Sequence, residues 1–397
     1  MVNATVIIIG SGLSGLTAAH RLLSLLPSLP STSCVTVKVL EADGRAGGRL
    51  VSGERGGDLG AAWTWENDGN LRSLAEGLSV RVVPQQWRGK VATTGERDRE
   101  AREGEVACGE GGSRFVGGAS AVVDRLVTAL SLSSVSLSLS SPVTAITYSS
   151  TTSKVGVTVT TPATVTTPSS STVLSADCVI VAAPPHAIAS SITFTPPLPP
   201  AVLSSMSRTQ TWMHGTGKAV VTYDRPFWRE EGYSGTAMGG DVFDVTWDNS
   251  YGEDGEGDGA VYAIAGFLKN GDGNGGGVEV TARGGGTLTG REDEQKNALE
   301  ARVLESLVRW FGPEAGGGTV STKTWTGSSL HGHGEHDRTA SSHNYGLHKR
   351  HPGTDGRVVF AGTESEDENG HMEGAVKAGV RAAEEVGRVL GGLGGGK

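Results

Sequence analysis

A glycine turn close to the start of the chain limits what this sequence can fold into. The turn follows four apolar residues, 6–9, which is typical of a strand buried on both faces. Its glycines form the pattern GxGxxG at Gly10, Gly12 and Gly15. The residues after the turn are apolar at helical spacing, and a second apolar stretch, residues 35–40, ends at Glu41. This order predicts a βαβ unit and an α/β fold with a parallel sheet.

The spacing of the three glycines has a mechanical reason. The first allows a tight turn, the second lets a pyrophosphate approach the backbone, and the third lets the helix pack on the strand. The helix then offers unpaired N–H groups and the positive end of its dipole to the phosphates. Glu41 stands where a carboxylate accepts ribose hydroxyls, although a connector rich in serine and proline, residues 27–33, lengthens the usual interval of about 20 residues. The segment therefore predicts a Rossmann-type dinucleotide site.

The sequence after Glu41 suggests which dinucleotide binds. EADGRAGGRL (41–50) resembles the second phosphate-binding motif of glutathione-reductase-like flavoproteins, in particular the flavin monoamine oxidase family. The resemblance continues in the family's order and covers almost the whole chain, with GGDLGAAWTW (56–65), RFVGGAS (114–120), VIVAAPPHAI (179–188), RPFW (225–228) and AGTESEDENGHMEGAVKAG (361–379). It implies a discontinuous Rossmann-like FAD-binding domain of residues 1–84, 113–196 and 330–397. An α+β substrate domain would comprise residues 85–112 and 197–329.

The resemblance also implies particular cofactor contacts. Arg45 and Arg49 would flank the pyrophosphate, and the backbone of Val143 would hold the adenine. The isoalloxazine would be lined by Gly60, Ala61, Ala62 and Trp63, and the site would be completed by Gly362, Thr363 and Met372. A helix expected at 374–390 would begin near Met372, where its dipole stabilises the negative charge of reduced flavin. No cysteine lies near 333–335, where some family members attach flavin, so we expect non-covalent FAD.

The implied reaction is the oxidation of a primary, secondary or polyamine to an imine, with oxygen as acceptor and hydrogen peroxide as product. Family members place two aromatic rings before the flavin, but His371 stands at one of these positions and residues 334–336 at the other. His371 and His336 are candidates for substrate positioning or acid/base catalysis. Lys269 is the candidate for the lysine that reaches flavin N5 through a water, or else an exposed loop lysine. Lys218 is interpreted as structural or exposed.

Residues 85–112 are a second departure from the family. Family members insert a long helical substrate subdomain there, whereas this stretch is short and charged, which predicts a shortened form with a more open cavity. A larger substrate would then bind, or a second subunit of a homo-oligomer would supply the missing wall. The acidic run at 364–368 either borders the entrance and attracts a cationic amine or is a solvated loop.

Composition excludes several other classes. The net charge of −9 leaves no basic surplus for a nucleic-acid partner. The chain has no run of eighteen apolar residues and no room for a signal peptide before residue 6, so we expect no membrane partner and a cytoplasmic location. Three scattered cysteines and histidines without a recognisable ligand spacing indicate no metal. Two alternatives remain: another flavin chemistry, such as desaturation, isomerisation or oxidation of a biosynthetic intermediate, and a flavin-stabilised binding protein without turnover.

Overall fold

The computed structural model describes residues 2–28, 32–93, 99–100, 111–161, 169–251, 261–269, 290–325, 345–367 and 370–393. The chain forms two compact units. Unit 1 comprises Met1–Gly48, Val123–His214 and Gly327–Lys397, and unit 2 comprises Arg49–Val122 and Gly215–Thr326. Within the described part of the chain, none of the helices combines the length and the apolar character that a membrane span requires.

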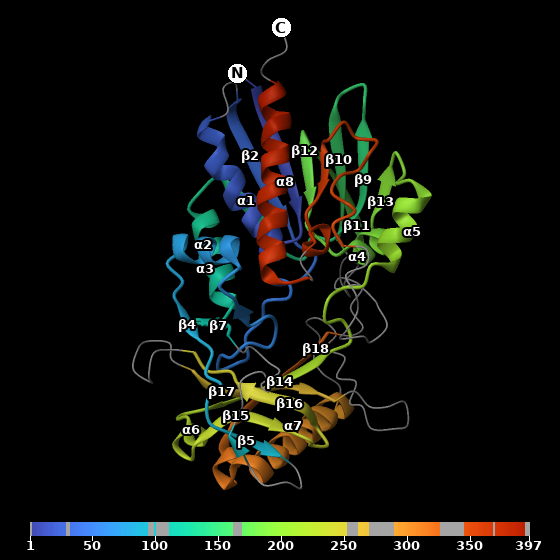
Figure 1. The fold of residues 1–397 in the computed structure, drawn as a ribbon. Coiled ribbons are helices and arrows are strands. Elements are labelled where there is room, and N and C mark those ends of the chain that lie inside the picture. The colour runs from blue at the N-terminus through green and yellow to red at the C-terminus, as the bar shows by residue number, and fades with distance from the viewer. Residues whose placement is uncertain are drawn as a thin grey trace. The chain divides into compact units, whose positions relative to one another are not determined.

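Unit 1 is built on a parallel sheet of five strands in the order β19-β12-β1-β2-β8 (Figure 1). Its strands are β1 (Val2–Ile9), β2 (Thr32–Leu40), β8 (Val135–Ser138), β12 (Cys178–Val181) and β19 (Val358–Phe360). Helix α1 (Leu13–Leu25) connects β1 to β2, as the sequence predicts. The expected mixed α/β architecture is thereby confirmed.

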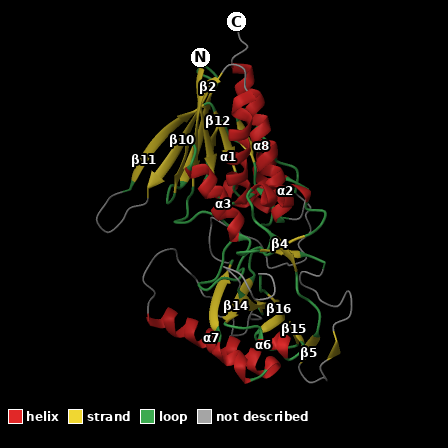
Figure 2. Cartoon of the chain, turned by 90° about the vertical axis from the view of Figure 1, so that its left-hand side faces the viewer, coloured by secondary structure: helices red, strands yellow, loops and turns green. Residues whose placement is uncertain are grey.

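A second sheet of unit 1 packs against one face of the parallel sheet (Figure 2). It contains β9 (Val143–Ser149), β10 (Lys154–Thr161), β11 (Ser170–Ala176) and β13 (Thr193–Thr195) in the order β11-β10-β9-β13. The stretch 173–182 is divided between the two sheets at Asp177, with β11 before this residue and β12 after it. The Asp177 carboxylate accepts hydrogen bonds from the Thr5 N–H (2.9 Å) and from Lys154 Nζ (2.7 Å). These bonds fix the chain where it passes from one sheet to the other.

The other face of the parallel sheet carries α1 and the carboxy-terminal helix α8 (Met372–Leu393), which lie side by side (Figure 1). A Cβ added at Gly379 of α8 would lie 2.4 Å from the Ser14 carbonyl oxygen, so the two helices approach closely because this residue is glycine. The described residues also form the helices α2 (Gly69–Gly77), α3 (Ser120–Ser131), α4 (Pro185–Ser191), α5 (Pro200–Arg208) and α6 (Phe227–Glu230), with 3-10 turns at Leu26–Ser28, Pro313–Gly317 and Thr363–Ser365.

Unit 2 contains a seven-stranded sheet in the order β18-β14-β17-β16-β15-β5-β6. Its strands are β5 (Lys90–Thr93), β6 (Arg99–Glu100), β14 (Gly217–Tyr223), β15 (Tyr233–Met238), β16 (Phe243–Asp248), β17 (Tyr262–Leu268) and β18 (Thr319–Thr324). Helix α7 (Gly290–Phe311) covers one face of this sheet, where its buried side chains pack against Val221 of β14. Val220 points to the opposite face and packs with Leu59 and Trp247.

A small antiparallel sheet, β3-β7-β4, completes unit 2. It pairs β3 (Trp63–Thr64) and β4 (Val82–Pro84) with β7 (Ser113–Phe115). Unit 2 therefore contains residues 49–84 and 113–122, which the sequence analysis assigns to the FAD-binding domain, while unit 1 contains 197–214. The compact units and the predicted functional domains thus divide the chain at different places, and the functional division stays a prediction.

Candidate functional site

The glycine turn between β1 and α1 has the geometry that its sequence pattern predicts. Gly10 has φ +98°, and a Cβ there would lie 2.5 Å from the Ala182 carbonyl oxygen. A Cβ on Gly15 would lie 2.0 Å from the Gly10 carbonyl oxygen, so both positions require glycine for packing. A Cβ on Gly12 would meet nothing within 4 Å. Gly12 therefore leaves the backbone at the start of α1 open to a ligand.

The first turn of α1 is suited to an anion. Its N-cap residue, Gly12, makes no side-chain capping bond, and the first turn holds no acidic residue. The N–H groups and the positive end of the helix dipole can therefore interact with a phosphate. The loop after β2 packs beside this turn, because the Gly47 N–H donates to the Ser11 carbonyl at 2.9 Å.

Glu41 ends β2 and contacts the glycine turn directly. Its Oε2 accepts hydrogen bonds from the Ser11 N–H (2.7 Å) and from the Ser11 hydroxyl (2.8 Å). Its Oε1 accepts a hydrogen bond from the Asp43 N–H at 2.9 Å. A half-buried carboxylate is thus held beside the turn, as a ribose-binding group requires.

The structure gives Arg45 a local role. Its guanidinium donates to the carbonyl oxygens of Ala46 (3.0 Å) and Gly48 (2.5 Å), so it shapes the loop next to the glycine turn. Burial lowers the pKa of this guanidinium, and the nearby carboxylates of Asp43 and Glu41 act in the opposite direction. Val143, the predicted adenine contact, is buried at the start of β9.

The carboxy-terminal candidates of unit 1 lie close together. The Thr363 hydroxyl donates to the His371 carbonyl at 2.8 Å, and Met372 begins α8 directly afterwards. Gly362 precedes them at a position where a Cβ would lie 2.6 Å from the Ala183 carbonyl. The His371 side chain is exposed, and its ring meets Trp212 edge-on with centroids 5.5 Å apart.

The candidates of unit 2 lie on a tightly packed segment. A Cβ on Gly60 would lie 1.9 Å from the Arg49 carbonyl, and the same carbonyl accepts a hydrogen bond from the Ala61 N–H at 3.2 Å. The indole N–H of Trp63 donates to Gln85 Oε1 at 2.8 Å. Arg49 and residues 60–63 are therefore brought together by the backbone.

Lys218, interpreted from the sequence as structural or exposed, is a buried residue of unit 2 with polar contacts to the segment 58–60. It lies on β14 with 4% of its surface exposed, and Nζ donates to the carbonyl oxygens of Gly60 (2.6 Å) and Asp58 (3.3 Å). The ammonium also lies 5.3–5.8 Å from the ring centroids of Trp63, Trp247 and Phe267. A sequence signal for this burial is the run of apolar residues directly after the lysine, 219–221, because lysine is rarely buried without a polar partner.

Of the two other catalytic candidates, the structure describes Lys269 but not His336. Lys269 follows β17 and is exposed, with its backbone N–H bonded to the Val242 carbonyl at 2.9 Å. Its side chain therefore lacks the burial of Lys218, and the assignment of Lys269 to catalysis stays a prediction. His336 and the predicted wall at 334–336 lie outside the described residues.

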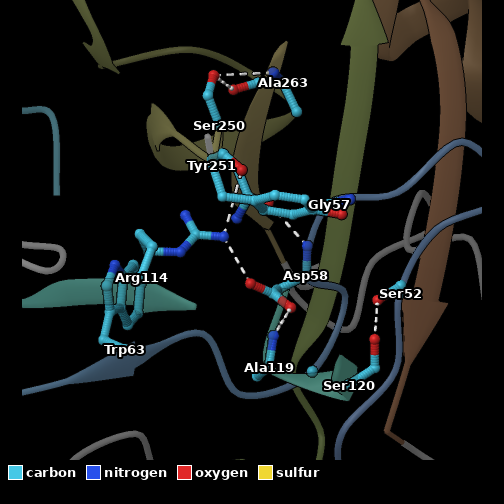
Figure 3. A network of polar contacts seen from close by, with 12 residues as sticks. Ser52, Gly57, Asp58, Trp63, Arg114, Ala119, Ser120, Ser250, Tyr251 and Ala263 are labelled. Carbon is cyan, nitrogen blue, oxygen red and sulfur yellow. Dashed lines mark hydrogen bonds and ion pairs between the residues drawn. The ribbon is translucent and has the colours of Figure 1, made fainter. Parts of the chain in front are cut away.

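A buried polar network surrounds the segment that holds Lys218 (Figure 3). Arg114 donates to Asp58 Oδ2 at 2.5 Å, and both side chains have no exposed surface. The Ala119 N–H donates to Asp58 Oδ1 at 2.8 Å, and the Asp58 N–H donates to Asn249 Oδ1 at 2.7 Å. Among the described residues, no group of three His, Cys, Asp or Glu side chains could hold a metal ion.

The chain matches two family models. The model described as flavin containing amine oxidoreductase matches residues 101–387, which is more than half of the chain. The model described as NAD(P)-binding Rossmann-like domain matches residues 8–78, which include the glycine turn.

Curated relatives match about half of this chain. An amine oxidase [flavin-containing] of Oncorhynchus mykiss is 33% identical over 216 residues, and human amine oxidase [flavin-containing] B is 30% identical over 226 residues. An L-amino acid dehydrogenase of Synechocystis is 29% identical over 209 residues. The matches cover 52%, 53% and 52% of this chain, and 37%, 38% and 40% of the three relatives, respectively. The chain thus spans well under half the length of these relatives.

Solved structures share the fold. A triple mutant of putrescine oxidase has a TM-score of 0.70 at 19% identity, covering 97% of this chain and 98% of that one. Cyclohexylamine oxidase from Brevibacterium oxydans has a TM-score of 0.69 at 21% identity, covering 98% of this chain and 99% of that one. At these identities the likeness concerns the fold alone.

Proposed function

This chain belongs to the flavin containing amine oxidoreductases, and we propose that it binds FAD non-covalently and oxidises a primary, secondary or polyamine to an imine. Oxygen would be the acceptor and hydrogen peroxide the product. The observation that supports this most directly is the glycine turn of unit 1, where open backbone at Gly12, an uncapped helix start and Glu41 lie together.

Each group of residues in the proposed FAD site would have its own role. The first turn of α1 would bind the diphosphate, and Glu41 would accept hydrogen bonds from the ribose. Val143 would contact the adenine. Gly362, Thr363 and Met372 would contact the flavin, with the start of α8 favouring negative charge there. The same proposal includes Arg45 and Arg49 at the diphosphate and Gly60, Ala61, Ala62 and Trp63 at the ring.

Bound flavin would supply the acceptor of a hydride equivalent from the carbon beside the amine nitrogen. The protein would orient that carbon and exclude water. We propose Lys218 rather than Lys269 as the lysine that serves the flavin, because its Nζ is buried beside the Gly60 carbonyl. His371 would be a substrate-positioning group, since it is exposed beside Thr363 and Met372.

The relatives support an amine as the substrate, because two of the three curated relatives reported above carry the name amine oxidase. The solved neighbours include a putrescine oxidase and a cyclohexylamine oxidase, so a diamine and a cyclic amine are the first substrates to test. The similarity to an L-amino acid dehydrogenase makes an acceptor other than oxygen the second candidate function.

The proposal is tested on the purified protein. We expect a yellow product whose flavin is released as intact FAD when the protein is denatured by heat. A panel of putrescine, cyclohexylamine, benzylamine and L-amino acids is then added under air, and peroxide is measured. Anaerobic bleaching of the flavin without peroxide under air would favour a dehydrogenase, and a protein that stays colourless with added FAD would contradict the proposal.

A further inference from the structure

The ion pair between Asp58 and Arg114 has no place in the reaction proposed above. Both side chains are fully buried, and Arg114 Nη2 lies 2.5 Å from Asp58 Oδ2. The loss of hydration largely offsets the attraction within a buried ion pair, so such a pair is a poor way to gain stability alone. The pair therefore invites a functional explanation.

The explanation lies in what the backbone beside Asp58 contacts. The carbonyl oxygens of Asp58 and Gly60 both accept hydrogen bonds from Lys218 Nζ, at 3.3 Å and 2.6 Å. The Asp58 side chain points to Arg114 and to the Ala119 N–H instead (Figure 3). One residue thus joins the buried ion pair, through its carboxylate, to the lysine, through its peptide group.

The segment between these contacts depends on anchors outside itself. The backbone requires glycine at two positions of the segment, because Gly57 has φ +77° and a Cβ on Gly60 would clash. Neither residue has a side chain that could anchor the segment by packing. The segment is held by Tyr251, whose hydroxyl accepts the Gly57 N–H at 3.2 Å, by Asn249 and by the carboxylate of Asp58. A change in the Asp58 carboxylate would therefore move the carbonyl groups that hold Lys218.

The ammonium of Lys218 is sensitive to such a movement. The ammonium also lies over aromatic ring faces, which attract a cation less directionally than a carbonyl oxygen does. Lys323 on β18 is paired directly opposite Lys218, and Arg114 is a further cation of the same network. The carbonyl oxygens of Asp58 and Gly60 give the ammonium two directional contacts in the described part of unit 2.

We propose that Asp58 and Arg114 are positioning residues for Lys218: their ion pair fixes the 57–60 segment, and this segment fixes the ammonium. The inference rests on the proposed function only in taking Lys218 to serve the flavin. It assigns a role to two residues that do not contact the reacting atoms.

The first test measures the position of Lys218 without using activity. Reductive methylation with formaldehyde and cyanoborohydride is followed at each lysine by mass spectrometry of peptides, with and without FAD. We expect Asp58→Asn to raise the labelling rate of Lys218 at least about tenfold, because the lysine leaves its buried position more often. The double variant Asp58→Asn with Arg114→Gln, which removes both charges and allows an amide pair, should bring the rate back toward that of the unmodified protein.

The matched control is Arg229→Gln. Arg229 also pairs with a fully buried carboxylate of unit 2, Asp248, at 2.7 Å. Its loss should lower stability while leaving Lys218 labelling within about twofold of the unmodified protein. Equal labelling of Lys218 in Asp58→Asn and the unmodified protein would overturn the proposal. So would an equal rise in Arg229→Gln at matched stability, because the pair would then act on the fold alone.

The second test uses the FAD-loaded protein and any amine that bleaches it. Asp58→Asn should lower kcat about 10- to 100-fold with KM little changed, and the double variant should recover part of the loss. Failure of the protein to bind FAD or to oxidise an amine would contradict the proposed function but leave the labelling result intact. An altered labelling rate with unchanged kcat would retain the positioning of Lys218 and remove its catalytic consequence.

Discussion

Glu41 shows how much a single carboxylate can contribute to nucleotide binding. Its two oxygens accept three hydrogen bonds from Ser11 and Asp43, which hold it beside the glycine turn. Glu41→Gln should weaken FAD binding about 10- to 100-fold, because a charged acceptor is replaced by a neutral one. Titration of the FAD-free protein with FAD, followed by quenching of flavin fluorescence, measures this.

Glu384→Gln serves as the control for this prediction. Glu384 is a partly exposed glutamate of unit 1 that pairs with Arg21 on the helices α8 and α1. We expect its replacement to leave FAD affinity unchanged within about twofold, since surface ion pairs contribute little. An equal loss in both variants would show that the effect is not specific to Glu41.

The two candidate lysines make a second prediction at the scale of the residue. Lys218→Met keeps the length of the buried side chain and removes the ammonium between Gly60 and the aromatic rings. It should slow anaerobic flavin reduction at least about tenfold. Lys269→Met, on an exposed residue, should change the rate less than about twofold. Stopped-flow absorbance separates the two, and the reverse order would assign the role to Lys269.

The contact between α1 and α8 belongs to the scale of the element. A Cβ at Gly379 would lie 2.4 Å from the Ser14 carbonyl oxygen and 3.0 Å from the Ala18 nitrogen, both of them backbone atoms of α1. Gly379→Val would force the helices apart and should lower the free energy of unfolding by about 1–3 kcal/mol or more. Urea unfolding followed by circular dichroism measures the change.

Gly387 offers a control on the same helix. A Cβ there would lie 3.5 Å from Leu25 Cδ1, which is ordinary contact. Gly387→Ala should therefore stabilise the protein by up to about 1 kcal/mol, because alanine has the higher helix propensity. If both substitutions destabilised the protein equally, close approach of the two helices would not explain the requirement for glycine.

The distribution of histidines makes a prediction for the whole molecule. All ten histidines lie in unit 1, whereas seven of the eight tryptophans lie in unit 2, the exception being Trp212. Burial lowers the pKa of His20, His348 and His351. His351 is held between the Pro196 carbonyl and the Gly353 N–H, which requires the neutral ring. These side chains therefore stabilise unit 1 in their neutral form.

The sign of the pH dependence follows from these shifts. The folded-state pKa values lie below the ordinary histidine value of about 6.5, so the full contribution is present above that pH. It is lost as the pH falls from 6.5 through the folded-state pKa values, since the unfolded chain then binds more protons. Hydrogen exchange at pH 7.5 and 5.5 should show faster opening of unit 1 at the lower pH and a smaller change in unit 2.

His351→Asn tests the source of this dependence. Asparagine offers an acceptor to the Gly353 N–H and does not titrate in this range, so the variant should be less stable at pH 7.5 by about 1 kcal/mol or more. The loss of protection in unit 1 between pH 7.5 and 5.5 should be smaller than in the unmodified protein. An unchanged pH dependence would assign the effect to other groups.

The amino-acid sequence by itself determined the βαβ unit, because its evidence is local: apolar runs, glycine spacing and a terminal carboxylate lie within 41 residues. It also led to the family, which the match over residues 101–387 confirms. The helix expected at 374–390 lies within α8 of the structure, Met372–Leu393.

Only the tertiary structure decided the surroundings of Lys218 and the partner of Asp58. Lys218 contacts Gly60, Asp58 and Phe267, which lie 49–160 residues away in the sequence. The spacing of residues along the chain does not show which distant segments will face the same side of a strand. The passage of the chain from β11 to β12 at Asp177 is fixed in the same way, because two hydrogen-bond partners of the Asp177 carboxylate come from other strands. Contacts over such sequence distances are set by sheet order and packing, which local propensity does not encode.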